Sequence, residues 1–211
     1  MAYDANEEEQ VEAFKRWWRE NGVAVIGGLA LAVVITLGWQ WWQGQREAKA
    51  HLAGQVYAEL LAKLDSAPAE ARAPAERLLS DFAGTTYADL AALALARVEV
   101  EGGQADAARV RLQHLVDNGR DESIKFLARL RLARLDWGMG DAEAALRQLD
   151  TAWPEAFMAE AETLRGDLLL ALKRPDEARK AYDAALAQAA LLGQETGLIR
   201  LRRDDLGGST S

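Results

Sequence analysis

Residues Asn21–Gln45, NGVAVIGGLALAVVITLGWQWWQGQ, contain no Asp, Glu, Lys or Arg, and Gly22–Gly38 is almost wholly apolar. An α-helix rises about 1.5 Å per residue, so roughly 20 such residues cross the ~30 Å hydrocarbon core of a bilayer. Indole rings prefer the headgroup level of a membrane, and five of the seven Trp residues stand at the two ends of this run: Trp17, Trp18, Trp39, Trp41 and Trp42. The stretch therefore predicts a transmembrane anchor over residues 21–45, in contact with the lipid bilayer.

The residues before the span favour a retained anchor over a cleaved signal. A secretory signal begins with basic residues and has a shorter apolar run, whereas Met1–Gln10 is acidic and carries no base. We expect residues 1–20 to form an acidic tail, disordered over Met1–Gln10, and then an amphipathic lead-in.

The basic residues on either side of the span indicate its orientation. Lys and Arg favour the cytoplasmic side of a membrane. Three of them precede the span and two follow it closely: Lys15, Arg16 and Arg19, then Arg46 and Lys49. This small difference predicts a cytoplasmic N-terminus, with the C-terminal part of the chain outside the cytoplasm.

The composition of the rest of the chain predicts one all-α domain. The 211 residues carry a net charge of −8 and no Cys, which argues against a nucleic-acid partner and excludes disulfides and thiolate metal sites. About 165 residues follow the span, enough for one domain with its own core. After residue 45, Ala, Leu, Arg and Glu dominate and β-branched residues are sparse, a composition typical of helices.

Residues 46–84 are predicted to be a helical connector between the span and the main domain. The apolar spacing over Gln45–Asp65 predicts a helix that continues out of the membrane. Ser66–Pro74 holds two of the four Pro residues, so we expect a break there and a shorter helix over Ala75–Phe82.

A repeat of helix–turn–helix type occupies residues 85–206. Its small residues Ala96, Ala133 and Gly166 stand 37 and then 33 residues apart, and each is followed at the same offsets by a turn residue, a second small residue and a large apolar residue. The later positions are Gly103, Ala108 and Leu112; Gly140, Ala145 and Leu149; and Lys173, Ala178 and Tyr182. This spacing resembles the tetratricopeptide repeat (TPR), although the early Trp and Tyr positions of that motif are absent.

The repeat predicts an α-solenoid of helix pairs behind the transmembrane helix. We expect helices near residues 86–101, 104–117, 121–138, 141–152, 155–172 and 176–191. Residues 194–205 are expected to form a capping helix and residues 207–211 a flexible tail. Such solenoids present extended surfaces that bind proteins or peptides.

No arrangement of residues predicts catalysis, a cofactor or a metal site. The two His residues, His51 and His114, have no partner at ligand spacing, and the Gly pairs follow helices rather than strands. Two basic clusters occur, Arg129, Arg131 and Arg134, and Arg200, Arg202 and Arg203. We interpret them as solvated helix faces in preference to sites for acidic ligands. The chain is not expected to be an enzyme.

Two surfaces are candidates for partner binding. In the span, the small residues Ala24, Gly28, Ala32 and Thr36 recur every four positions and could let a partner's transmembrane helix approach closely, although chance explains such spacing too. In the repeat domain, Trp137, Trp153, Phe157 and Met158 are candidates for exposed apolar contacts, with ordinary inter-helix packing as the favoured alternative.

The whole layout resembles a known family. Residues 9–22, EQVEAFKRWWRENG, follow an acidic tail and precede one span and a TPR-like domain, and this order is similar to that of the YfgM-type ancillary subunits of the bacterial Sec translocon. The resemblance implies a non-enzymatic, single-pass inner-membrane scaffold with a cytoplasmic N-terminus and a periplasmic TPR-like domain. It also implies association with translocon subunits and with PpiD, a membrane-anchored periplasmic chaperone of prolyl-isomerase type, in assisting newly translocated proteins.

Two questions stay open at the level of sequence. The acidic tail allows an alternative function, that of a membrane-tethered regulator that acts through its cytoplasmic N-terminus. Self-association through the span or the repeats is also possible.

Overall fold

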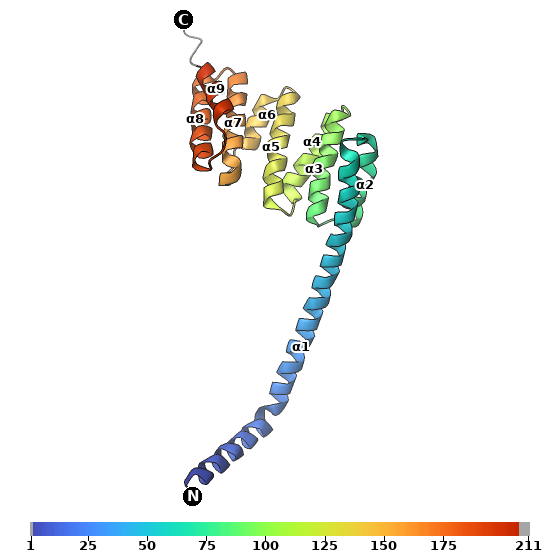
Figure 1. The fold of residues 1–211 in the computed structure, drawn as a ribbon, viewed down its shortest axis with the longest axis vertical. Helices are drawn as coiled ribbons and strands as arrows, with labels where there is room; N and C mark the ends of the chain where they lie inside the picture. Colours follow the sequence, from blue (N-terminus) through green and yellow to red (C-terminus); the bar gives the residue numbers. More distant parts are fainter. Residues whose placement is uncertain (1, 207–211) are drawn as a thin grey trace. The chain divides into compact units, whose positions relative to one another are not determined.

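The computed structural model describes the backbone of residues 2–206 and the side chains of residue 12 and residues 14–206. Its regular secondary structure in this range is entirely helical, as predicted. The chain divides into two compact units, Met1–His51 and Leu52–Ser211, and the division falls inside the first helix, α1 (Ala2–Leu64) (Figure 1). The tail predicted for residues 207–211 lies outside the described residues.

The first unit consists of the N-terminal part of α1. Within the described residues, α1 is the one helix that is long and apolar enough to cross a membrane. Its large apolar side chains are exposed along the span, among them Val23, Ile26, Leu29, Val34, Leu37 and Trp41. An exposed apolar surface of this extent is suited to lipid rather than water.

The disorder expected over Met1–Gln10 is wrong for residues 2–10, which belong to α1. This segment has no Pro or Gly, and it is rich in Ala, Glu and Gln, which form helices readily. Extending an existing helix costs far less than nucleating one, so the tail continues the helix that the span begins.

The second unit begins with the C-terminal end of α1, which packs with α2 (Pro68–Asp81) and α3 (Thr86–Glu101) around Ala53, Val56 and Leu60. The break after α1 is shorter than expected, because α2 starts at Pro68 and runs through Pro74. Pro68 suits a first helical turn, where its missing N–H is not needed. Pro74 forfeits one hydrogen bond, and the burial of the surrounding α2 residues Ala71, Ala75 and Leu78 offsets that loss.

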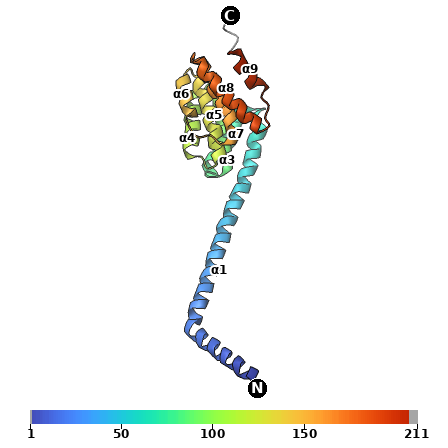
Figure 2. The same ribbon diagram turned by 90° about the vertical axis from the view of Figure 1, so that its left-hand side faces the viewer.

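Three helix pairs and a final helix complete the unit: α3 with α4 (Ala105–Asn118), α5 (Glu122–Gly138) with α6 (Ala142–Leu149), α7 (Glu155–Ala171) with α8 (Pro175–Leu191), and α9 (Gly197–Asp205). Figure 1 shows these pairs following one another in chain order, and the same helices overlap in the view of Figure 2. For helices α3 to α9, the predicted and observed bounds differ by one residue at most, except at the end of α6 and the start of α9. The predicted fold class, an all-α chain with a TPR-like solenoid, is confirmed.

Helix α6 ends at Leu149 rather than at residue 152 because Trp153 folds back onto it. The Trp153 indole Nε1–H donates to the Leu149 carbonyl at 3.0 Å and satisfies one of the free carbonyls at the helix end. Pro154 follows directly, and a residue before Pro disfavours the helical conformation.

The small repeat positions are buried between the helices, and at Gly166 the two helices of a pair approach too closely for a side chain. Ala96, Ala133 and Gly166 are buried, and a Cβ atom added at Gly166 would come within 2.5 Å of Cε1 of Tyr182 on α8. The turn residues Gly103 and Gly140 have φ of 74° and 92°, and Lys173 holds the equivalent left-handed position at 60°. The repeat therefore keeps its geometry even where its residue types change.

Candidate partner-binding surfaces

The first helices of the three pairs form one continuous face of the repeat unit. Helix α3 contacts α5, and α5 contacts α7. We call the surface formed by α3, α5 and α7 the first-helix face. Because it extends across several repeats, this face can contact one ligand with residues from more than one repeat.

Two cavities lie on the first-helix face and share Arg134 as a lining residue. The α3–α5 cavity has a volume of about 460 Å³, and the α5–α7 cavity, which α9 also borders, has about 440 Å³. The first is lined mainly by apolar atoms of Val100 on α3, Leu112 on α4 and Leu135 on α5. The charged residues Arg97, Glu101 and Arg131 also line it. The two cavities therefore lie next to each other, on either side of Arg134.

An apolar side chain is exposed at the same repeat position on each first helix. Val100, Trp137 and Leu170 each follow the small repeat residue by four positions, and their exposed fractions are 45%, 38% and 44%. Val100 lines the α3–α5 cavity and Trp137 lines the α5–α7 cavity. Repetition of an exposed apolar position along one face is typical of a protein-binding surface.

The arginines of the α3–α5 cavity differ in their partners. Arg97 pairs with Glu101 at 2.7 Å and with Asp65 at 3.4 Å, and Arg134 pairs with Glu160 at 2.6 Å. Arg131 is half-buried, and its Nη1 donates to the Leu93 carbonyl at 3.3 Å. Among the described residues, no carboxylate lies within ion-pair distance of Arg131. Burial, followed by the positive charges of Arg134 and Arg97, lowers the pKa of Arg131 from its ordinary value.

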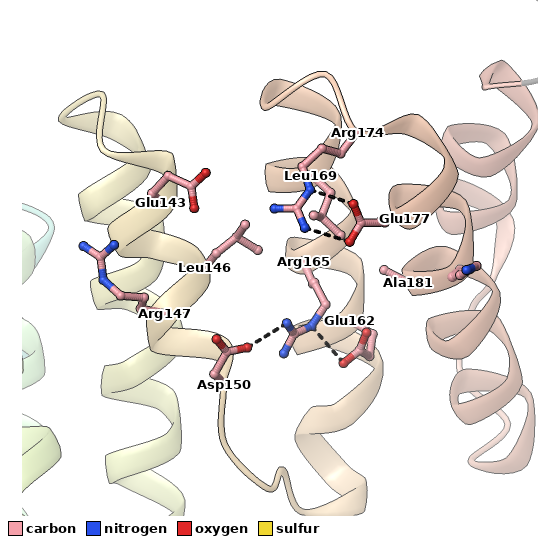
Figure 3. A pocket seen from close by; sticks show the side chains of 11 residues that line it. Glu143, Leu146, Arg147, Asp150, Glu162, Arg165, Leu169, Arg174, Glu177 and Ala181 are labelled. Atoms are coloured by element: carbon pink, nitrogen blue, oxygen red, sulfur yellow. Dashed lines mark hydrogen bonds and ion pairs between the residues drawn. The ribbon is translucent and has the colours of Figure 1, made fainter.

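A third cavity, of about 460 Å³, lies between α6, α7 and α8, and five of its eight charged side chains form ion pairs with one another (Figure 3). Arg165 bonds to Asp150 at 3.0 Å and to Glu162 at 3.3 Å. Arg174 makes two hydrogen bonds of 2.7 Å with Glu177, and this contact lowers the pKa of the Glu177 carboxyl. These charged groups satisfy one another within the protein, so their presence in the cavity does not indicate a ligand.

Comparison with known proteins identifies the family of this chain. A family model for a tetratricopeptide repeat-like domain matches residues 15–208. A protein of Escherichia coli strain K12 with the name ancillary SecYEG translocon subunit is 33% identical over 181 residues, which cover 86% of this chain and 87% of that protein. Proteins of the same name from Aggregatibacter actinomycetemcomitans and Neisseria gonorrhoeae are 29% and 27% identical, over 98% of this chain and 100% of each relative. The chain belongs to the TPR-like family of ancillary SecYEG translocon subunits.

Membership in the ancillary subunit family confirms the resemblance seen in the sequence. The relatives are named as subunits of a translocon and not as enzymes, in agreement with the predicted non-enzymatic role. The name of these relatives, together with the long apolar helix α1 of this chain, indicates a membrane-anchored protein. No solved structure matches the chain significantly.

The four candidate residues of the repeat domain, three aromatic residues and one Met, do not share one environment. Trp137 is exposed and lines the α5–α7 cavity. Trp153 is only 7% exposed and packs against Phe126, with ring centroids 5.4 Å apart. Phe157 and Met158 are partly buried against the same core. The expectation that Trp153 is exposed is therefore wrong, because the turn before Pro154 folds its ring under α5; binding of a partner by any of the four stays a prediction.

The candidate residues of the span lie on an exposed face of α1. Ala24, Gly28, Ala32 and Thr36 are exposed, and a Cβ at Gly28 would meet no atom within 4 Å. The Thr36 hydroxyl donates to the Ala32 carbonyl at 2.7 Å, which keeps its polar hydrogen inside the helix. The face is sterically ready for another helix, and helix docking there stays a prediction.

Sequence reasoning missed two buried acids that the repeat itself could have revealed. Glu99 and Asp136 are each 1% exposed and stand 37 residues apart, as do Arg97 and Arg134. Glu99 accepts two hydrogen bonds from Arg111, at 3.0 and 2.6 Å. Asp136 lies 2.7 Å from Arg109 Nε in an ion pair that lacks hydrogen-bond geometry. An acidic residue that recurs at the repeat interval is the signal by which the sequence could have indicated this pair.

Proposed function

We propose that this protein is an ancillary subunit of the SecYEG translocon in the bacterial inner membrane, where it acts as a non-enzymatic scaffold. The observation that carries this proposal is the similarity to relatives of that name, which extends over the span and the repeats alike. In the proposed topology, residues 1–20 lie in the cytoplasm and residues 21–45 cross the membrane. Residues 46–84 connect the span to the periplasmic repeat domain, residues 85–206.

The span face Ala24, Gly28, Ala32 and Thr36 is the proposed contact with a translocon helix. Small residues allow helix backbones to approach closely in a membrane, where van der Waals packing stabilises association. The open space around Gly28 supports this role.

The first-helix face is the proposed contact with a periplasmic chaperone of the PpiD type, or with a polypeptide as it leaves the channel. Its support is the row of exposed apolar residues Val100, Trp137 and Leu170. Because the anchor confines this face to the membrane surface, the effective concentration of a partner there is raised. Trp137 is the residue of the sequence-predicted set that best fits this role.

Photo-crosslinking in living cells tests the span contact. A photoreactive residue at Gly28 should give adducts with translocon subunits, identified by mass spectrometry. The matched controls are Ile26 and Val34, which are exposed on the opposite side of α1. Equal adducts from all three positions would contradict a specific helix face, and adducts with cytoplasmic proteins alone would favour a regulator that acts through its N-terminal tail.

The same method tests the chaperone contact. A probe at Trp137 should give adducts with a periplasmic chaperone, whereas a probe at Val110 should not, since Val110 is an exposed apolar residue on the second helix α4. Adducts of Trp137 with a second copy of this chain would mean that the face mediates self-association instead.

A further inference from the structure

The α3–α5 cavity combines the Arg131 guanidinium, which has no carboxylate within ion-pair distance among the described residues, with an apolar wall. We infer that this cavity binds a carboxylate side chain within an extended polypeptide segment, Arg131 holding the carboxylate and the apolar wall holding a neighbouring apolar side chain. The inference deepens the proposed function and rests on it, because it names the chemistry of the segment that the scaffold would hold.

The position of Arg131 is the first argument. A guanidinium has five N–H donors, and the Arg131 side chain is held by its hydrogen bond to the Leu93 carbonyl. Arg97 and Arg134 already have carboxylate partners, so Arg131 is the arginine of this cavity that is available to an incoming anion. A carboxylate here would offset both the burial of Arg131 and its repulsion by Arg97 and Arg134.

The cavity wall is the second argument. Apolar atoms of Val100, Leu112 and Leu135 line the space beside Arg131. A free inorganic anion would leave that surface in contact with water. A peptide with an acidic residue next to an apolar one fills both parts of the cavity, and burial of the apolar side chain adds to its affinity.

The position of the second cavity beside the first favours an internal segment over a chain end as the ligand. Arg134 lines both the α3–α5 and the α5–α7 cavity, so a bound chain can continue from Arg131 past Trp137. Each cavity is lined by a carboxylate that pairs with an arginine, Glu101 with Arg97 in the first and Asp167 with Arg202 in the second. The second cavity is the weaker anion site because Leu164 stands at the repeat position of Arg131. We therefore place the carboxylate at α3–α5 and apolar side chains toward Trp137.

Peptide binding to the full-length protein in lipid nanodiscs tests this inference. The probe is a fluorescein-labelled peptide with two Glu-Leu pairs in a Gly-Ser background, with both termini blocked, and fluorescence anisotropy is the measurement. We expect Arg131→Gln to weaken binding at least ~10-fold, as for loss of a charge-assisted hydrogen bond. Arg129→Gln is the matched control, because Arg129 lies on the same helix and does not line the cavity; its affinity should stay within about twofold of the wild type, a difference too small to represent a lost ion contact.

A second variant keeps the test valid if Arg131→Gln disturbs the fold. Val100→Glu alters an exposed cavity residue and leaves the Arg131–Leu93 bond in place. The new carboxylate should occupy the site and weaken peptide binding as well. Unchanged binding by this variant would contradict the inference.

Peptide variants supply the remaining outcomes. Replacing Glu by Gln in the peptide should abolish binding, and equal binding of the Gln peptide would overturn the role of the carboxylate. Binding only by a version of the peptide with an unblocked C-terminal carboxylate would overturn the assignment to an internal segment. No binding by the wild-type protein would refute the inference, while crosslinking of Gly28 to the translocon would still support the proposed function, so the two can fail separately.

Discussion

At the scale of single residues, Gly166 and Tyr182 depend on each other. A Cβ at Gly166 would lie 2.5–2.8 Å from three atoms of the Tyr182 ring, and this buried ring has little room to move. We expect Gly166→Ala to lower the free energy of unfolding by about 1–3 kcal/mol, the usual cost of overpacking a core. Chemical denaturation of the full-length protein in detergent, followed by circular dichroism, measures the change.

The control for this prediction is Gly138→Ala, since a Cβ at Gly138 would meet no atom within 4 Å. It should leave stability unchanged or raise it by up to about 1 kcal/mol, because Ala favours a helix more than Gly does. Equal losses from both variants would mean that close approach of α7 and α8 is not what requires Gly166.

Tyr182 also gives a prediction about alkaline pH. Its hydroxyl donates to Asp167 at 2.8 Å, and burial, followed by this bond and the Asp167 charge, raises the pKa of the phenol above its ordinary value of 10.0. The folded protein therefore holds the proton more tightly than the unfolded chain does. The contribution of Tyr182 to stability is complete below about pH 10 and shrinks as the pH rises beyond that value.

Comparison of the wild type with Tyr182→Phe isolates this effect. At neutral pH the variant should lose about 1 kcal/mol, the typical net value of one hydrogen bond. As the pH rises above 10, the difference between the two proteins should narrow, because only the wild type has this phenol to titrate. A difference that is constant with pH would contradict the raised pKa.

At the scale of elements, α5 depends on its N-terminal cap. The Asp121 carboxylate accepts hydrogen bonds from the backbone N–H groups of Ser123 and Ile124, at 2.9 and 3.2 Å. Asp121→Ala should destabilise the protein by about 1 kcal/mol, and Asp121→Asn, which keeps a capping oxygen, should cost much less. Thermal unfolding of the two variants side by side distinguishes loss of the cap from loss of the charge alone.

At the scale of the whole molecule, the absence of Cys from the sequence makes the proposed topology directly measurable. Single-cysteine variants at two exposed positions, Glu12→Cys before the span and Ala171→Cys in the repeat unit, can be labelled with a membrane-impermeant maleimide. When only the outer membrane is permeabilised, we expect labelling at position 171 and none at position 12. Position 12 should be labelled only after the inner membrane is disrupted as well. The reverse pattern would place the repeat domain in the cytoplasm.

The sequence by itself determined the long apolar helix, the helical class and most of the helix bounds of the repeats. Each of these follows from local physics: an uncharged apolar run as long as a bilayer is thick, helix-forming composition, and small or turn residues at a fixed interval. The left-handed turns at Gly103 and Gly140 were predictable for the same reason.

The tertiary structure alone decided which side chains are available. Trp137 and Trp153 are the same residue type near helix ends, yet one lines a cavity and the other is buried against Phe126. In the same way, Arg131 was indistinguishable in sequence from its neighbours Arg129 and Arg134 until α3 brought Arg97 and the Leu93 carbonyl beside it. Exposure and ion pairing depend on contacts between residues distant in the chain, and local periodicity carries no information about which of those contacts form.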